Sequence, residues 1–411
     1  MAYGDGPADR TLRDGWDAFC ERLRQAGEKA FKEANPADPL SRADAFRFLT
    51  RNLGQAFPLA LETRDPAFPQ IHWFTHPTMK LGGDVADFTY RQAWVSGEYQ
   101  YKVTGRKGTA RWFNLTVQGP RPDRIPGTDF APLHEPFGDI PESNLFGHQI
   151  ATDAQGNFEL YIGGPERPRN WLPTTPGSRK LFIREAFDAW YETPTTLTIE
   201  RLGMEGPPPN PTPERMVGAF EWAGEFLYGA MRDWPEHAWA TSGGVVDPHR
   251  LNRFPEDRQA NDASDAKRGR MAAHMVWRLQ ADEALIVEMD QHDGFWIFNL
   301  GNVFVGSSDY LYRPVSYTPA RTWVGADKVV RFVIAHDDPG VHNWLDTAGF
   351  GDGNLTYRNL MSQSPASFRT RLVQREKLLD ELPKDTAMVT SGQRAEQLRD
   401  RYRSVKLRFG L

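Results

Sequence analysis

Hydrophobic residues recur at helical spacing over 16–23 and again over 46–57, near the start of the chain. Residues three and four positions apart share one face of a helix, so this pattern predicts two amphipathic helices. A third helix is predicted to begin at 212–213, because threonine caps helices well and proline suits their first turn. Apolar spacing among charged residues over 366–407 predicts two more helices, separated near Pro383.

Between these helical regions the pattern shortens to alternation, which is typical of β-strands. Residues 99–104 and 110–117 flank a glycine-bounded turn, and this arrangement predicts a β-hairpin. The segment 120–144 is rich in proline, glycine and aspartate and is predicted to be a long surface loop over a cleft. A short helix is predicted at 184–191.

Three landmarks occur twice, in the same order. The string Asn-Trp-Leu begins at Asn170 and Asn343, and Phe-Asn-Leu begins at Phe113 and Phe298. An arginine follows each Asn-Trp-Leu string, at Arg184 in the first copy and at Arg358 in the second. Such an ordered set indicates duplication of one β-rich unit. We therefore expect an α+β protein with a sandwich-like body of two repeated halves, flanked by N- and C-terminal helices.

The expected division of the chain follows from these patterns. It comprises an N-terminal helical region (1–84), a first β-rich repeat (85–205), a proline-rich linker and helix (206–271), a second β-rich repeat (272–362) and C-terminal helices (363–411).

The net charge of −5 does not favour nucleic-acid binding, which needs a basic surface. No apolar run approaches the length of a membrane span, and the single cysteine, Cys20, cannot form an internal disulfide. We expect a cytoplasmic protein, with homo-oligomerisation left open. Aromatic residues make up 12% of the chain, which indicates either a large core or a cavity walled by rings.

The second copy carries the most specific string, D-P-G-V-H-N-W-L-D-T from Asp338 to Thr347, with Arg358 beyond it. This string resembles the signature of the bacterial domain-of-unknown-function 1214 (DUF1214) family. The segment from Gly82 to Tyr90 resembles another family segment, G-x-D-N-P-D-x-x-Y, but lacks its Asn-Pro. The resemblance implies a β-rich α+β fold and, because related proteins accompany the breakdown of steroids and aromatic compounds, a lipophilic ligand.

No nucleotide-binding or zinc-protease motif occurs, so no cofactor is predicted. The densest polar cluster is predicted to be catalytic: His336 or His342 transfers a proton, Asp338 or Asp346 orients that histidine, and Arg358 holds an oxyanion or carboxylate. These histidines and aspartates are absent from the first copy, which favours a functional role. Two alternatives stay open. The cluster could bind a divalent metal, or Asp346 and Arg358 could form a buried structural pair.

Five aromatic residues are candidates for binding a substrate, although strand aromatics also fill cores: Tyr90, Trp112, Trp277, Trp296 and Trp344. The leading functional hypothesis is a cofactor-independent enzyme, a lyase, hydratase or hydrolase, that acts on a hydrophobic ring-bearing small molecule. The alternatives are a non-catalytic carrier of lipophilic molecules and a metal-dependent enzyme.

Overall fold

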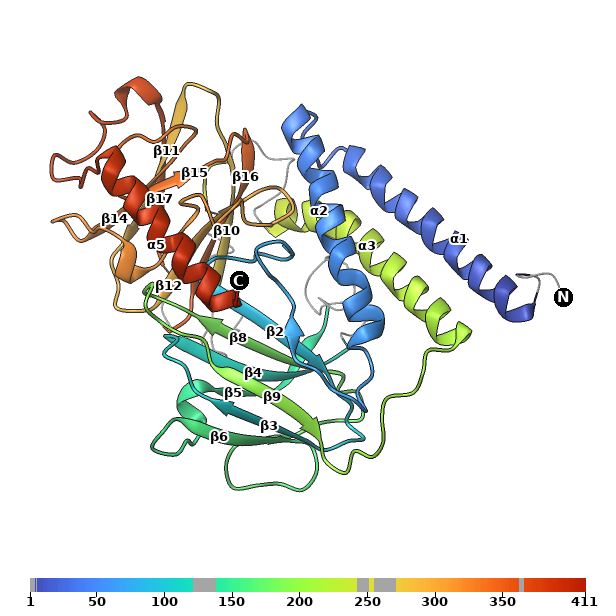
Figure 1. The fold of residues 1–411 in the computed structure, drawn as a ribbon. Helices are drawn as coiled ribbons and strands as arrows, with labels where there is room; N and C mark the ends of the chain where they lie inside the picture. The colour runs from blue at the N-terminus through green and yellow to red at the C-terminus, as the bar shows by residue number, and fades with distance from the viewer. Residues whose placement is uncertain (1–3, 5, 121–137, 242–250, 255–270, 362–365) are drawn as a thin grey trace.

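The computed structural model describes residues 4, 6–120, 138–241, 251–254, 271–361 and 366–411. Two β-rich halves lie next to each other, three helices pack together at one side, and a C-terminal helix crosses the second half (Figure 1). The architecture is α+β, as the sequence predicts. In the described part of the chain, no helix is both long enough and apolar enough to cross a bilayer.

The three packed helices are α1 (Pro7–Glu28), α2 (Pro39–Phe57) and α3 (Pro213–Thr241). Each begins at a proline, which suits a first turn whose N–H groups have no partner within the helix. The predicted start of α3 is confirmed: Thr212 accepts a hydrogen bond from the Arg215 N–H at 3.2 Å. Their apolar faces bury one common cluster, so the helices form a layer beside the sheets.

The first half contains two sheets. One sheet has the order β1-β2-β8-β4-β5 and the other β7-β6-β3-β9. Their bounds are β1 His72–Trp73, β2 Phe88–Trp94, β3 Tyr101–Arg106, β4 Trp112–Gly119, β5 Ile140–Phe146, β6 Asn157–Ile162, β7 Trp171–Leu172, β8 Lys180–Ala186 and β9 Thr196–Arg201.

The second half also contains two sheets, with the orders β10-β16-β12-β13 and β15-β14-β11-β17. Their bounds are β10 Met271–Arg278, β11 Glu283–Asp290, β12 Trp296–Gly301, β13 Ser316–Tyr317, β14 Val329–Ala335, β15 Trp344–Asp346, β16 Asp352–Asn359 and β17 Phe368–Gln374. The last helix is α5 (Ser391–Phe409), and short helical turns occur at Lys29–Phe31, Pro58–Glu62, Gly147–Gln149, Pro319–Arg321 and Arg375–Lys377.

The strand orders match element by element when the two halves are compared. β2-β8-β4 corresponds to β10-β16-β12, and β7-β6-β3-β9 corresponds to β15-β14-β11-β17. In both halves a short edge strand pairs in parallel with its neighbour: β7 with β6 in the first half, and β15 with β14 in the second. The predicted repetition of one β-rich unit is therefore present in the fold.

The repeated asparagine has the same task in both halves. Asn170 donates to the Ala151 and Glu159 carbonyls, and its own carbonyl accepts from the Ala151 N–H. Asn343 does the same with Trp323 and Arg331. An asparagine side chain can satisfy several backbone groups at once where no strand does so. The Asn-Trp-Leu string is therefore an architectural motif.

The arginine landmark does not repeat, which corrects the sequence-based pairing of Arg184 with Arg358. Asn114 lies opposite Arg184 in the first half, whereas its counterpart Asn299 lies opposite Thr356. Strand register places Arg358 two residues beyond the position of Arg184. The spacing from the repeated asparagine to the arginine differs by only one residue between the copies, 14 against 15, which made the two arginines look equivalent.

The predicted hairpin of 99–104 and 110–117 is wrong, because β3 and β4 belong to different sheets. Gly105 lies near the end of β3, opposite β9, and Gly108 lies in the connection that crosses to the other sheet. A Cβ atom would lie 2.6 Å from the Thr196 carbonyl oxygen at Gly105 and 2.2 Å from the Thr193 oxygen at Gly108. The glycines are needed for this close crossing.

Three further predictions differ from the structure. Part of the expected loop 120–144 is strand β5, and residues 121–137 lie outside the described part. The expected helix at 184–191 is the end of β8 and a turn. The first of the two expected C-terminal helices is replaced by β17, which pairs with β11 and extends the second half to Gln374. α5 confirms the other.

The two halves meet through a small apolar cluster. Phe88, Trp112 and Ala186 come from the first half, and Phe295, Ile297 and Leu360 come from the second. Each half has its own larger core between its two sheets. The cluster at the junction places Trp112 and Leu360 beside each other, and a cavity adjoins them.

Candidate functional site

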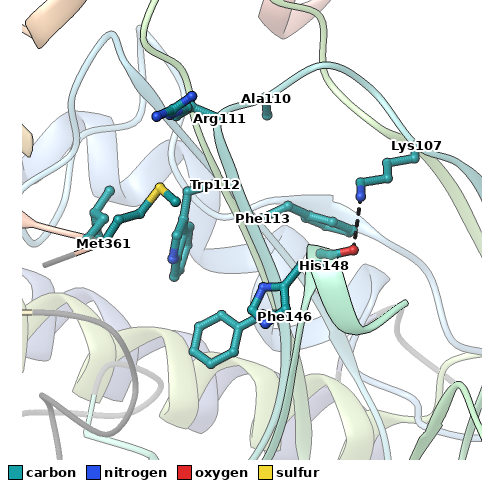
Figure 2. Close-up of a pocket in the computed structure, with 10 residues that line it drawn as sticks. Lys107, Ala110, Arg111, Trp112, Phe113, Phe146, His148 and Met361 are labelled. Atoms are coloured by element: carbon teal, nitrogen blue, oxygen red, sulfur yellow. Dashed lines mark hydrogen bonds between the residues drawn. The ribbon is translucent and has the colours of Figure 1, made fainter. Parts of the chain in front are cut away.

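The cavity at the junction has a volume of about 350 Å³ and is bordered by both halves. Figure 2 shows Trp112, Phe113 and Phe146 forming its walls, with Met361 at one side. The residues that line it are Lys107, Ala110, Arg111, Trp112, Phe113, Phe146, Gly147, His148, Leu360 and Met361. We call it the Trp112 cavity. Its volume lies within the range of small-molecule sites.

Local packing positions the aromatic walls. The Trp112 ring contacts Phe88 and Phe146, at centroid distances of 5.5 and 6.1 Å. A Cβ on Gly147 would lie 3.1 Å from Cβ of Phe113, so glycine lets the short turn after β5 approach β4. The ends of β4, β5 and β16 thus converge on one apolar space.

The charged groups at the cavity are all basic. Lys107 donates to the Gly147 carbonyl at 2.9 Å, and Arg111 is exposed and forms no ion pair with any described residue. His148 stacks on Phe146, with the two ring planes only 7° apart. Among the described residues, no aspartate or glutamate lines the space. An apolar wall with a basic rim complements a hydrophobic anion.

The predicted catalytic cluster is not brought together. His336 bonds to the Thr347 hydroxyl at 2.8 Å and to the Gln280 carbonyl at 3.2 Å. Asp338 accepts from the Gly340 N–H and pairs with Arg394 at 3.0 Å. No hydrogen bond or ion pair joins these residues to His342, Asp346 or Arg358, all of which the structure describes.

The expected pair of Asp346 and Arg358 is absent as well. Asp346 pairs with Arg313 at 2.8 Å, whereas Arg358 donates to the Gly83 carbonyl at 2.8 Å. A Cβ on Gly83 would lie 2.5 Å from Nη2 of Arg358, so the glycine admits the guanidinium. Within the described residues, no three His, Cys, Asp or Glu side chains gather as a metal site would require.

His342 borders a smaller cavity of about 200 Å³ beside α5. Its Nδ1 lies 2.9 Å from Oδ1 of Asn343. Two arginines, Arg321 and Arg401, line the same space.

Only Trp112 among the five predicted substrate-binding aromatics borders the Trp112 cavity. Trp277 and Trp296 are at most 2% exposed and fill the core of the second half. Trp344 donates its indole N–H to the Ala335 carbonyl, as Trp171 does to Gly163. Tyr90 stacks on Phe88 at 4.7 Å. These four side chains thus pack within the protein, Trp277 and Trp296 between the sheets of the second half, Trp344 against Leu378 and Leu382, and the partly buried Tyr90 against the helical-layer and junction clusters.

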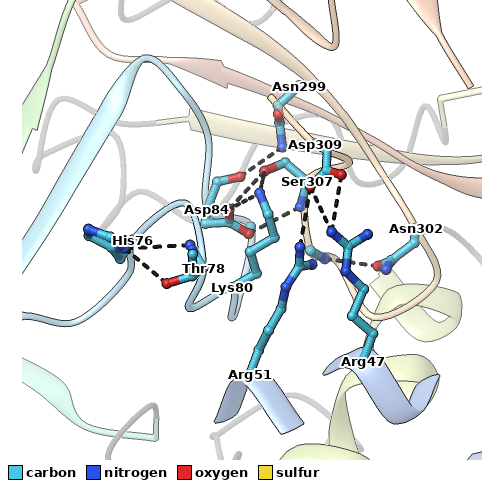
Figure 3. A network of polar contacts seen from close by, with 12 residues as sticks. Arg47, Arg51, His76, Thr78, Lys80, Asp84, Asn299, Asn302, Ser307 and Asp309 are labelled. Carbon is cyan, nitrogen blue, oxygen red and sulfur yellow. Dashed lines mark hydrogen bonds and ion pairs between the residues drawn. The ribbon is translucent and has the colours of Figure 1, made fainter. Parts of the chain in front are cut away.

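A buried ionic network joins the segment before β2 to the second half (Figure 3). Nζ of Lys80 lies 3.1 Å from Oδ2 of Asp84 and 3.1 Å from Oγ of Ser307, which donates to Asp84 at 2.8 Å. The Lys80 ammonium also lies 3.6 Å from the ring centroid of Tyr310. We call Lys80, Asp84 and Ser307 the lysine triad.

Lysine, serine and aspartate could supply a nucleophile and a base, but these side chains are buried. The three residues are at most 2% exposed. Burial lowers the pKa of Lys80 to about 8, and the Asp84 carboxylate opposes that shift. Nearer the surface, Arg47 and Arg51 from α2 bind Asp309. The network therefore connects the helical layer and the first half to the second half through ion pairs and hydrogen bonds.

Asp87 is the centre of a second buried cluster. Arg321 pairs with it at 2.6 Å and Arg408 of α5 at 3.5 Å, while the Ser316 hydroxyl donates at 2.6 Å. Burial opposes ionisation of Asp87, but the surrounding arginines, including Arg401, outweigh it and lower its pKa. The segment 82–90 that carried the family resemblance thus supplies the centres of two buried networks.

Sequence reasoning missed most of the cavity. Phe146 and His148 fell in or beside a predicted loop, and Lys107 and Arg111 in or beside a predicted turn. Only Trp112 was identified. The available signal was the alternation at β4, which placed an aromatic residue on the outer face of its sheet.

Comparison with known proteins adds a fold and no activity. No family model matches the chain, and no curated protein matches it. The chain is similar to the crystal structure of an uncharacterized protein from Burkholderia cenocepacia, with 28% identity over 90% of this chain and 99% of that chain and a TM-score of 0.78. A protein from Vibrio parahaemolyticus aligns at 10% identity over 80% of this chain and 98% of that chain, with a TM-score of 0.43.

Proposed function

We propose that the protein binds a hydrophobic, ring-bearing small molecule with an acidic group in the Trp112 cavity. The observation that carries this proposal is the combination of an apolar aromatic wall with a rim whose charged groups, among the residues that the structure describes, are all basic. Burying the ring removes apolar surface from water, and the basic rim attracts the acid. This function is that of a carrier or binding protein.

The size of the cavity favours a fused two-ring compound. Protein cavities of this volume enclose most of a small ligand, and the flat faces of Trp112 and Phe146 suit an aromatic ring. Arg111 and Lys107 are exposed, so the acidic group of such a ligand would stay near solvent while the ring enters. Naphthoate is therefore a suitable probe.

Naphthoate is expected to bind at a ratio of one per chain, and Arg111→Gln is expected to weaken it by about tenfold, roughly 1.4 kcal/mol, because a charge-assisted contact is lost. Isothermal titration calorimetry measures both. Naphthamide, which has the same shape and no charge, should respond little to the substitution.

The matched control is Arg106→Gln, which removes an exposed arginine of the same strand connection that does not border the cavity. If both variants lost the same naphthoate affinity, the effect would come from the general surface charge and not from a contact at the cavity. Absence of naphthoate binding in the unmodified protein would overturn the proposal.

A second candidate function is acid–base catalysis without a cofactor, as a lyase, hydratase or hydrolase. One observation favours it: His342 lines a cavity together with two arginines, which could hold an anionic substrate. Turnover would then depend on His342 and not on His336. We also propose that the protein belongs to the DUF1214 family and that it is located in the cytoplasm.

A further inference from the structure

A second cavity, beside α5, differs in its lining from the Trp112 cavity. It has a volume of about 200 Å³ and is bordered by the turn after β8, the segment around β13 and one face of α5. The residues that line it are Trp190, Pro314, Tyr317, Arg321, His342, Gln397, Leu398, Asp400 and Arg401. We call it the His342 pocket.

Arg401 is a buried cation that forms no ion pair with any described residue. It is 3% exposed, and its two Nη atoms donate to the hydroxyl and the carbonyl of Ser316, at 3.0 and 2.7 Å. The nearby carboxylate of Asp87 is already bound by Arg321 and Arg408. Burial, and then repulsion by Arg321, lower the pKa of Arg401 to about 10.

This arrangement leaves positive charge in excess inside the protein. Two buried arginines, Arg401 and Arg408, and the partly buried Arg321 surround one buried carboxylate, Asp87. A buried charge is costly unless an opposite charge compensates it. In the part of the chain that the structure describes, Asp400 is the one acidic residue that lines the pocket, and it is exposed, so water screens its charge. An anion that enters the pocket would supply the missing compensation.

The hydrogen bonds of Asn343 fix the tautomer of His342. Nδ2 of Asn343 donates to two carbonyls, so its Oδ1 is the acceptor that faces Nδ1 of His342 at 2.9 Å. Nδ1 must therefore carry the proton. In the neutral ring Nε2 is then an acceptor, which is available to a ligand that carries a hydroxyl group.

Apolar groups complete the pocket. The Trp190 ring has the Arg321 guanidinium at 3.8 Å from its centroid, and Leu398 and Pro314 border the same space. A small ligand would therefore bring a carboxylate, a hydroxyl and a short carbon skeleton together.

We infer that the His342 pocket binds a small hydroxycarboxylate, with its carboxylate near Arg401 and Arg321 and its hydroxyl donating to His342. The inference concerns binding and is independent of the Trp112 cavity, because such a ligand has too little apolar surface for that site.

Lactate, lactamide and propionate provide the test, since they have nearly the same shape and differ in charge or in the hydroxyl group. Calorimetry on the full chain is expected to show lactate binding at least tenfold more tightly than neutral lactamide. Lactate should also bind more tightly than propionate, and His342→Phe should remove that difference in affinity. Equal affinity for lactate and lactamide, or no lactate binding, would overturn the inference.

Charge changes on α5 test the site without removing a buried arginine. Gln397→Glu places a carboxylate in the pocket and is expected to weaken lactate about tenfold, whereas Asp400→Asn should strengthen it a few-fold. Gln393→Glu is the matched control, one turn away and outside the pocket, where glutamate can still serve in the capping box with Thr390. Equal weakening by both glutamates would contradict a site at His342.

Discussion

Asp84→Ala is expected to lower the free energy of unfolding by about 3 to 5 kcal/mol, because it leaves the buried Lys80 ammonium without its carboxylate. The Ser307 hydroxyl and N–H lose an acceptor at the same time. Chemical denaturation followed by circular dichroism measures the change. Removal of both charges together, in Lys80→Met with Asp84→Leu, should cost much less, since no buried charge remains.

Asp309→Ala is the matched control in the same network. Asp309 binds Arg47 and Arg51 near the surface, where its side chain is 36% exposed, so its loss should cost less than about 1 kcal/mol. If Asp84→Ala and Asp309→Ala lowered the free energy of unfolding by similar amounts, the lysine triad would contribute no more to stability than the exposed ion pairs of Asp309.

The pH dependence follows from the same group. The pKa of Lys80 is about 8 in the folded protein and 10.5 ordinarily. Between these values the unfolded chain binds more protons than the folded one, so the contribution of Lys80 to stability rises with pH over this window. Lys80→Met should remove that rise.

Ala110→Trp is expected to weaken naphthoate binding by about 100-fold, roughly 2.7 kcal/mol, because the new indole would occupy the Trp112 cavity. Ala110 is partly exposed, so the substitution spares the core. Calorimetry measures the affinity, and a thermal melt confirms the fold.

Thr104→Trp adds the same ring at an exposed position of β3 that does not line the cavity. Its naphthoate affinity should equal that of the unmodified chain. Retained binding in Ala110→Trp would place the ligand elsewhere on the molecule.

The sequence predicted the architecture well where a residue's role is local. Asn170 and Asn343 could be recognised as architectural because both copies keep them, and their identical backbone contacts agree. The helix start at Thr212 followed from capping chemistry alone. The pairing of Arg184 with Arg358 was wrong because a shift of two positions in strand register hardly changes the distance in sequence between each arginine and its Asn-Trp-Leu string.

The candidate site could be predicted only in part, since its walls come from distant segments. Trp112, Phe146 and Leu360 lie at the ends of three strands, and alternation cannot say which sheets will face each other. The same limit made β3 and β4 look like a hairpin. His336, Asp338 and Asp346 are neighbours in sequence, yet each bonds outward to a different partner.

The central claim is that the Trp112 cavity binds a hydrophobic acid. A crystal structure of the protein soaked with bromonaphthoate tests it most directly, because the anomalous signal of bromine locates the ring. The account predicts one strong peak between Trp112, Phe146 and Leu360, with the carboxylate toward Arg111. A peak only at the outer surface or in the His342 pocket, or no peak at saturating ligand, would contradict it.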